Sequence, residues 1–356
     1  MGPRKVTLVK RSAWATMEEA RTMEEILIAG AGPAGAAAAL SARWEGATVR
    51  LVDPAKTARH KVCGEFLSPG VHEILEALGV WDQFTSLGPR AIRRCALHLG
   101  NHTKRWPLPE CAWGLSRLQL DQLLLDKARA AGASVCRGER YESNSVPASA
   151  PVISAFGRRK GQPPGDRLFG FKAHFHGPAD DAVELFFDRH GYVGVSGIEN
   201  GLTNVCGIAP ESLLRKYGFV FDDFVRRSPP LAERLNPLRR EMRWLVAGPL
   251  SFSAPATQSP RMYPAGDALG FVDPFTGSGI LNALLTGQLA GQAAARRIPP
   301  EEYLRKCRSL LRRPFWIASV LRGLAGQSVL HNLADWLPGP LLFRWTRADP
   351  RAVLSS

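Results

Sequence analysis

The sequence predicts an α/β protein that combines a parallel sheet, an inserted antiparallel β-sheet and a helical C-terminal tail. Between residues 26 and 53, an apolar run, a glycine-rich turn, a small-residue helix and a second apolar run follow one another. Between 168 and 208 apolar residues alternate with polar ones, which is typical of half-buried strands. Between 262 and 297, a strand, a glycine-rich loop and a small-residue helix follow one another, as they do from residue 26 onward.

The first unit is a strand, a helix and a second strand. The apolar run at residues 26–29 is short and stops at Gly30, which favours a buried parallel strand. The small residues that follow predict a helix to about Trp44, and residues 48–52 predict a strand that ends at Asp53. About 30 residues is the size of a mononucleotide-binding half of a Rossmann-type fold.

The next elements alternate between helices and short strands. The sequence predicts helices over 71–78 and 116–131, strands over 133–135 and 152–155, and a polar loop over 142–151. Near the end of the chain, it predicts a strand over 262–265, a helix over 279–297 and a helical, basic tail over 299–356.

An antiparallel sheet is expected in the middle section. Alternation over 168–175 puts the Phe side chains on one face and His174 and His176 on the opposite face. The two histidines could line a pocket, but we expect their face to be solvated. Further strands are predicted over 183–187, 192–198 and 204–208, with a hairpin turn at Asn200-Gly201. The aromatic side chains could line a substrate tunnel or form ordinary core: Phe169, Phe171, Phe175, Phe186, Phe187 and Tyr192. Residues 211–245 are expected to be helical.

Composition excludes several classes of protein. Of 356 residues, 45% are hydrophobic and 22% charged, which excludes a disordered chain, a collagen-like repeat and a coiled coil. No apolar run reaches the roughly 20 residues that cross a bilayer. The net charge of +14 favours nucleic acid, anionic lipid or a polyanionic cofactor as partner. Because the charge is spread along the chain, with no module of basic and aromatic residues, nucleic acid is not expected.

The six cysteines are scattered, with no pair at the spacing of a zinc site. The sequence therefore predicts no metal site and no disulfide framework. It predicts a cytoplasmic protein with reduced thiols. Residues 1–22 predict a flexible N-terminal extension, and Met23 is an equally natural start.

The glycine-rich turn predicts a dinucleotide site. Gly30 allows a tight turn, Gly32 lets the backbone approach a pyrophosphate, and Gly35 permits close packing of helix on strand. Pro33 and Ala34 begin the helix, whose N-terminus favours negative charge. Asp53 is placed to accept both ribose hydroxyls and disfavours a 2′-phosphate, so the nucleotide would be FAD or NAD.

A second motif, PAGDALGFVDPFTGSGILN at 264–282, selects FAD. After Gly266, Asp267 would bind a hydroxyl of the ribityl chain. The loop from Pro274 to Gly279, with Gly277 and Ser278, would present backbone N–H groups and a helix N-terminus to the flavin's pyrimidine edge. Such donors stabilise the negative charge that develops on reduction.

Four motifs occur in this order: GAGPAG, HKVCGEFLSPG, SRLQLDQLLLDKARAAGASV and GDALGFVDPFTGSGI. Together they resemble the geranylgeranyl-reductase-like FAD-dependent oxidoreductases, within the superfamily of para-hydroxybenzoate hydroxylase and aromatic-ring monooxygenases. The resemblance covers roughly 23–298 and implies a glutathione-reductase-like FAD-binding domain. It implies that Arg117 contacts the ribityl or pyrophosphate region and that Cys63-Gly64 lies near the isoalloxazine ring.

The loop at 60–70 holds the candidate catalytic residues. Cys63 beside a flavin could relay a proton, with Lys61 lowering its pKa, or could be a small buried hydrophobe. Gly64 is a further candidate in this loop, and Glu65 and Ser68 lie in the same loop and could reach flavin or substrate. Lys61 is also a candidate cofactor-binding residue. His60 is a weaker acid–base candidate.

The sequence departs from the superfamily where many members carry an Asp-Gly pair, because this chain has Ala155-Phe156-Gly157. It also lacks a second GxGxxG for a nicotinamide domain. The electron donor would be transiently bound NAD(P)H or another reduced carrier.

These observations predict a discontinuous FAD-binding domain: 23–88, 112–165 and 255–298. The substrate domain would comprise 89–111 and 166–254. We expect an oxidoreductase that transfers hydride between flavin N5 and a carbon–carbon bond of an isoprenoid-, lipid- or polyketide-like substrate. The alternative is an NAD(P)H- and O2-dependent monooxygenase of an aromatic or polyketide substrate. The basic tail would either pack on the substrate domain or contact a membrane surface.

Overall fold

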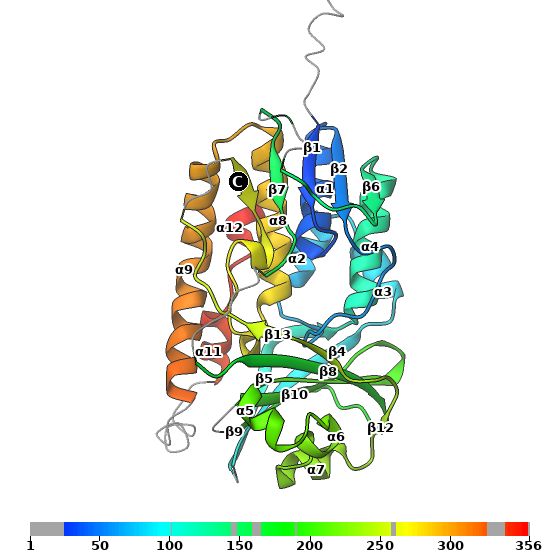
Figure 1. The fold of residues 1–356 in the computed structure, drawn as a ribbon, viewed down its shortest axis with the longest axis vertical. Helices are drawn as coiled ribbons and strands as arrows, with labels where there is room; N and C mark the ends of the chain where they lie inside the picture. Colours follow the sequence, from blue (N-terminus) through cyan, green and yellow to red (C-terminus); the bar gives the residue numbers. More distant parts are fainter. Residues whose placement is uncertain are drawn as a thin grey trace, which may run out of the picture.

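Two sheets lie at opposite ends of the molecule in the computed structural model (Figure 1). The structure describes residues 25–100, 102–143, 147, 149–158, 165–188, 191–257, 261–325 and 339–354. The predicted extension at 1–22 and the alternative start at Met23 lie outside the described residues. The fold class is confirmed: a parallel Rossmann-type core carries a separate, mostly antiparallel sheet.

The parallel sheet has five strands in the order β14-β7-β1-β2-β6. Its strands are β1 Ile26–Ala29, β2 Val49–Asp53, β6 Ser134–Arg137, β7 Val152–Ser154 and β14 Met262–Pro264. Three helices pack beside it: α1 Pro33–Trp44, α4 Arg117–Ala130 and α8 Gly279–Ala295. Small residues bring α1 and α8 together, because a Cβ on Gly287 would lie 2.2 Å from the Ala34 carbonyl oxygen.

The second sheet has the order β12-β8-β11-β10-β9-β4-β5-β3, with β13 also paired to β8. Its strands are β3 Phe66–Leu67, β4 Arg90–Leu99, β5 His102–Gly114, β8 Leu168–His176, β9 Ala182–Asp188, β10 Gly191–Gly197, β11 Leu202–Pro210, β12 Arg239–Arg240 and β13 Leu245–Leu250. All these pairs are antiparallel except β4 with β9. The predicted turn at Asn200-Gly201 is a 3-10 turn, Glu199–Gly201, and it joins β10 to β11.

Both faces of strand β8 are buried, so the expectation of a solvated face is wrong for His174. The Phe face packs against the helices α5 Glu211–Lys216, α6 Phe221–Val225 and α7 Pro229–Leu235. On the other face, Lys172 is fully buried and His174 is 3% exposed, because the loop before β3 covers that face. His176 at the strand end does remain exposed and pairs with Glu241.

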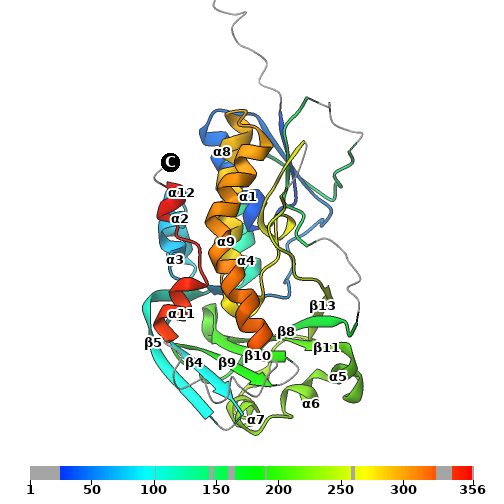
Figure 2. The same cartoon turned by 90° about the vertical axis from the view of Figure 1, so that its left-hand side faces the viewer.

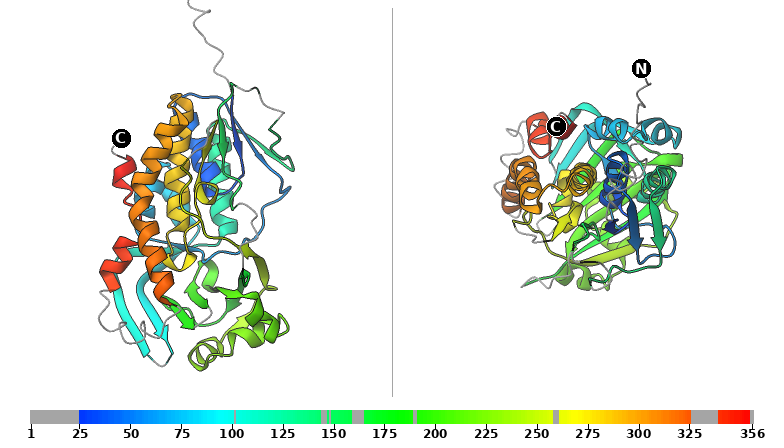
Figure 3. Two further views of the ribbon diagram at one scale, coloured as in Figure 1. Left: turned by 60° about the vertical axis from the view of Figure 1, so that its left-hand side comes forward. Right: turned by 90° about the horizontal axis from the view of Figure 1, so that it is seen from above.

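The remaining helices frame these layers. Helices α2 Val71–Ala77 and α3 Trp81–Ser86 follow β3. Two 3-10 turns, Gly266–Ala268 and Pro274–Thr276, lie between β14 and α8. The helical prediction for 211–245 holds to Leu235 and is wrong beyond it, where β12 and the start of β13 lie. In the tail, α9 Pro300–Ala325 runs along α8 on the outside of the molecule (Figure 2 and Figure 3). Helices α11 Gly339–Trp345 and α12 Arg351–Leu354 follow, and α11 packs against β5.

Candidate active site

The glycine-rich turn between β1 and α1 has no room for side chains at two positions. Gly30 has φ of 116°, and a Cβ there would lie 2.3 Å from the Ala155 carbonyl oxygen. A Cβ on Gly35 would lie 1.8 Å from the carbonyl oxygen of Gly30. Strand β1, helix α1 and the end of β7 therefore meet here at backbone contact distance.

Gly32, at the N-terminus of α1, borders open space and two cations. A Cβ there would meet only the Arg117 guanidinium at 3.7 Å and the Lys61 ammonium at 4.0 Å. Pro33 and Ala34 form the first turn of the helix, and all three residues line a cavity. A helix N-terminus beside two cations suits a diphosphate that approaches the Gly32 backbone.

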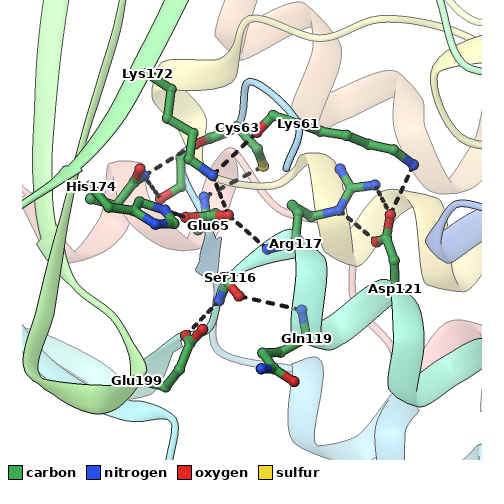
Figure 4. Close-up of polar contacts among 12 residues, drawn as sticks. Lys61, Cys63, Glu65, Ser116, Arg117, Gln119, Asp121, Lys172, His174 and Glu199 are labelled. Atoms are coloured by element: carbon green, nitrogen blue, oxygen red, sulfur yellow. Dashed lines mark hydrogen bonds and ion pairs between the residues drawn. The ribbon is translucent and has the colours of Figure 1, made fainter. Parts of the chain in front are cut away.

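Asp121 of α4 holds both cations in place (Figure 4). It accepts hydrogen bonds from Lys61 Nζ at 2.8 Å and from Arg117 Nε and Nη2 at 2.8 and 3.0 Å. Burial would lower the pKa of Arg117, but the charge of Asp121 and its hydrogen bonds raise it overall. Because the single carboxylate of Asp121 neutralises only one of the two cations, Lys61 and Arg117, one net positive charge remains beside Gly32. This charge suits a cofactor diphosphate. The Lys61 ammonium thus points to Asp121.

Asp53 at the end of β2 is fixed by backbone donors. One carboxylate oxygen accepts from the N–H of Ala31, and the other accepts from the N–H of Ala55, both at 2.8 Å. The carboxylate therefore stays beside the glycine-rich turn, and it is only half-buried. Carboxylate oxygens have further acceptor capacity, so Asp53 can bind ribose hydroxyls as well.

A cavity of about 360 Å³ connects this turn to the antiparallel sheet and to the tail. Asp267 lines it, and burial raises the pKa of its carboxyl, with the charge of Arg158 acting in the opposite direction. Gly266, Pro274, Gly277 and Gly279 also line the cavity. Ser278 does not, because its hydroxyl is buried against Thr276 at 2.9 Å. Helix α8 starts at Gly279 with its N-terminus toward this loop.

The loop that carries Cys63 and Gly64 is held by the antiparallel sheet. Asn204 Nδ2 donates to the carbonyl oxygens of Cys63 and Gly64 at 3.1 and 2.8 Å. The Cys63 sulfur accepts from the N–H of Glu65 at 3.4 Å. Cys63, Gly64 and Glu65 all line the cavity, so the structure brings the three candidate catalytic residues to its wall.

Glu65 is fully buried and has φ of 53°. Its carboxylate accepts from the backbone N–H of Arg117 at 2.7 Å and from His174 Nε2 at 2.6 Å, and it pairs with Lys172 (Figure 4). Burial would raise the pKa of Glu65, but the hydrogen bond from His174 and the charge of Lys172 lower it overall. Glu65 is therefore a buried anion that fastens the loop.

Sequence reasoning missed Lys172, Asn204 and Asp121. Lys172 and His174 lie two residues apart in a strand, and this spacing of polar residues opposite a Phe stripe was the available signal. The expected aromatic tunnel is divided. Phe171, Phe187 and Tyr192 line the cavity, whereas Phe175 and Phe186 lie in the core of the sheet domain.

His60, Glu65 and His174 have ligand atoms within 4.8 Å of one another, a spacing that a metal ion could bridge. The Lys172 ammonium already pairs with the same carboxylate. A metal cation at this position would therefore compete with the Lys172 ammonium for a single carboxylate in a buried site. Burial lowers the pKa of His60, and the positive charge of Lys172 acts in the same direction.

The fold and these residues define an FAD-dependent oxidoreductase. The open space at Gly32, the surplus cation beside it and the half-buried Asp267 carboxyl fit a diphosphate and a polyol chain. Residues 23–154 match the model of the FAD binding domain family.

Relatives confirm the resemblance to geranylgeranyl-reductase-like proteins. A menaquinone reductase of Mycolicibacterium smegmatis is 25% identical over 76% of this chain and 76% of its own length. A digeranylgeranylglycerophospholipid reductase of Methanothermobacter thermautotrophicus is 26% identical over 81% of this chain and 83% of its own length.

Solved structures share the fold. A geranylgeranyl bacteriochlorophyll reductase-like protein of Thermoplasma acidophilum has a TM-score of 0.68 at 20% identity, with 93% of this chain and 95% of that chain covered. A flavin-dependent brominase has a TM-score of 0.76 at 16% identity, with 93% and 94% covered.

Proposed function

We propose that this protein reduces a carbon–carbon double bond of a hydrophobic, isoprenoid-like compound. The cavity carries this proposal, because it begins at the flavin motifs and continues between apolar side chains of the antiparallel sheet and the tail. Leu97, Leu99, Val183 and Leu185 supply its wall on the sheet side. A long apolar pocket suits an extended hydrocarbon better than a small polar molecule.

Two relatives support this substrate class. One is named a menaquinone reductase and the other a digeranylgeranylglycerophospholipid reductase, and both compounds carry isoprenoid chains. Each relative is matched over about three quarters or more of its length, so the likeness extends beyond the family match at 23–154.

Bound FAD would supply the hydride from N5, with NAD(P)H or another reduced carrier as the source of electrons. The chain's own residues would bind the cofactor and orient the substrate beside it. Arg117 and Lys61 would hold the diphosphate, and Asp267 the ribityl hydroxyls. The apolar sheet residues would exclude water from the reacting bond, and the Cys63 thiol at the cavity wall would donate a proton to the substrate.

The experiment is an anaerobic reduction of the purified holoenzyme by NADH or NADPH, followed by addition of a polyprenyl naphthoquinone or an unsaturated isoprenoid lipid. Reoxidation of the flavin by the isoprenoid, with a saturated bond in the product by mass spectrometry, is expected. Reoxidation that requires O2 and yields a hydroxylated aromatic product would instead establish a monooxygenase. Cys63→Ala should slow product formation and leave the flavin spectrum unchanged, and Cys111→Ala serves as its matched control.

We propose that α9 brings the protein to a membrane surface. Arg305, Arg312 and Arg313 are exposed on one side of the helix, and Trp316 (67% exposed) and Val320 continue that side. Basic and aromatic residues on one face suit the interface of an anionic bilayer. Leu321 of the same helix lines the cavity, so a lipid could pass directly from the surface into it. None of the described helices is long and apolar enough to span a bilayer.

Flotation with phosphatidylglycerol vesicles tests this contact. The protein should float with anionic vesicles and not with phosphatidylcholine vesicles, and Trp316→Ala should reduce the floated fraction. Trp44→Ala is the control, because Trp44 is an exposed tryptophan at the end of α1 and does not belong to α9. Equal flotation of both variants with the parent protein would contradict the proposal.

A further inference from the structure

One end of the cavity is formed by strands β4 and β5 together with the tail. Cys95 and Trp106 are paired across these strands, and both line the cavity. Helix α11 closes the same end: its Gly339 packs on the Trp106 ring, and its Phe343 lies in one apolar cluster with Cys95. Arg347 follows this helix and also lines the cavity.

Arg347 is a half-buried cation, with its Nε fully enclosed, and it lacks an acidic partner among the described residues. Its Nη2 donates to the Thr276 carbonyl oxygen at 2.7 Å, and its Nη1 donates to the Phe343 carbonyl oxygen and to the Thr346 hydroxyl. All three acceptors are neutral. Burial lowers the pKa of Arg347 to about 9, which still leaves it charged at neutral pH. A charge that is partly removed from water and has no counter-ion among the described residues is costly, so this position favours an anion.

Two buried N–H donors at this end lack acceptors. Within the described ranges, neither Arg347 Nε nor Trp106 Nε1 has a hydrogen-bond partner. The neighbouring Cys95 thiol stays neutral, because burial raises its pKa to about 12. Buried donors are nearly always satisfied in folded proteins. Among the described residues, this end of the cavity therefore offers a cation and N–H donors, and no carboxylate that would repel an anion.

We propose that Arg347 and Trp106 bind an anionic oxygen, a carboxylate or a phosphate, at the head of an amphiphilic substrate. The apolar tail of that substrate would lie along Leu97, Val183 and Leu185 toward the flavin motifs. This inference rests on the proposed function, since it assigns the head group of the substrate whose hydrocarbon part the same cavity takes.

The contact with Thr276 raises a second explanation that the test must separate. Thr276 lies in the loop expected at the flavin's pyrimidine edge, so Arg347 could act on the reduced flavin instead of on a substrate. In that case its removal would lower the flavin midpoint potential. A head-group site predicts a loss of ligand affinity with the potential unchanged.

The test titrates the holoenzyme with decanoate, decyl phosphate and decanol, following flavin absorbance and tryptophan fluorescence. The two anions should bind at least 10-fold more tightly than decanol, since a hydrogen bond to a charged group contributes about that factor or more. Arg347→Met should abolish the difference between anion and alcohol, and Arg347→Lys should keep part of it. Trp106→Phe removes one N–H donor and should weaken the anions alone.

Arg344→Met is the matched control, because Arg344 is an exposed residue of α11, three positions before Arg347. Equal affinity for decanol and both anions would overturn the proposal, as would Arg347→Met shifting the potential while anion binding stays intact. A preference for only one anion identifies the head group as carboxylate or phosphate. Anion binding that persists in a protein unable to reduce isoprenoids would reject the proposed function and keep this site.

Discussion

The carboxylate of Glu65 accepts a hydrogen bond of 2.7 Å from the backbone N–H of Arg117, which lies 52 residues further along the chain. One bond thus joins the loop of the candidate catalytic residues to the first residue of α4. The side chain of Arg117 meanwhile turns to Asp121 and Gly32. Glu65 is therefore connected to the cofactor site through the helix N-terminus that it caps.

Replacement of Gly32 by Ala should abolish FAD binding without unfolding the protein. Gly32 has φ of −89°, which alanine adopts easily, and its Cβ would meet only flexible side-chain ends. The added methyl group would nevertheless occupy the space through which a diphosphate approaches the backbone. Isothermal titration with FAD and thermal unfolding of the apoprotein measure the two effects separately.

Gly35→Ala is the comparison for this variant. Its Cβ would lie 1.8 Å from a backbone oxygen, so the apoprotein itself should be destabilised. If Gly32→Ala bound FAD as tightly as the parent protein, the assignment of this turn to the diphosphate would be wrong.

Glu65→Gln should destabilise the protein by about 3–5 kcal/mol, the usual cost of leaving a buried charge without its partner. The buried Lys172 ammonium would lose its counter-ion, and His174 would lose its charged acceptor. The double variant Glu65→Gln/Lys172→Met should recover part of this loss, because no unpaired charge then remains. Urea unfolding of the three proteins measures the difference, and additive effects in the double variant would contradict the pairing.

The Glu65 carboxylate also makes the stability of the folded protein depend on pH. Because the folded protein lowers the pKa of Glu65 below 4.5, its stabilisation is complete above that value. It is lost as the pH falls through the lower, folded-state pKa. Acid unfolding of the parent protein should therefore be steeper below pH 4.5 than acid unfolding of Glu65→Gln.

Arg117→Met should weaken FAD binding by roughly 10- to 100-fold, the size of a charge-assisted hydrogen bond to a phosphate. Lys61 would then be the sole cation facing Asp121, and the net positive charge at Gly32 would disappear. Arg129→Met, in the exposed last turn of the same helix, is the control. Salt should weaken FAD binding in the control and have less effect in Arg117→Met.

The sequence predicts the parallel half of the fold closely because its signals are local. The helix predicted to about Trp44 ends there, and the helix predicted over 116–131 occupies Arg117–Ala130 with Ser116 as its N-cap. Strands β4 and β5 were not predicted, although residues 89–111 were assigned to the substrate domain. Arg93, Arg94 and Lys104 interrupt apolar alternation there, so their pairing depends on the tertiary structure.

The glycine-rich turn of the site could be predicted from the sequence, because it depends on glycine and local backbone geometry. The buried ion pairs of the site could not be predicted in this way. Gly30 and Gly35 have a fixed spacing in sequence. The partners of Glu65 lie 107 and 109 residues away, and the alternation that puts Lys172 opposite the Phe stripe does not say whether its face is buried. His174 was expected to be solvated for the same reason, since the loop that covers it comes from a distant part of the chain.

Asp273→Asn should stabilise the protein above pH 6 and remove a step in its pH profile. Burial raises the pKa of Asp273 to about 6, although the Phe275 N–H and the Arg322 charge act in the opposite direction. A folded-state pKa above the ordinary value of 3.8 means that the folded protein binds more protons between these two values. Stability therefore falls as the pH rises from about 4 to 6, by at most about 3 kcal/mol. Asparagine keeps the oxygen that accepts from Phe275, so the turn before the flavin loop should persist. Thermal unfolding from pH 4 to pH 8 compares the two proteins, and parallel profiles would show that Asp273 does not titrate in this range.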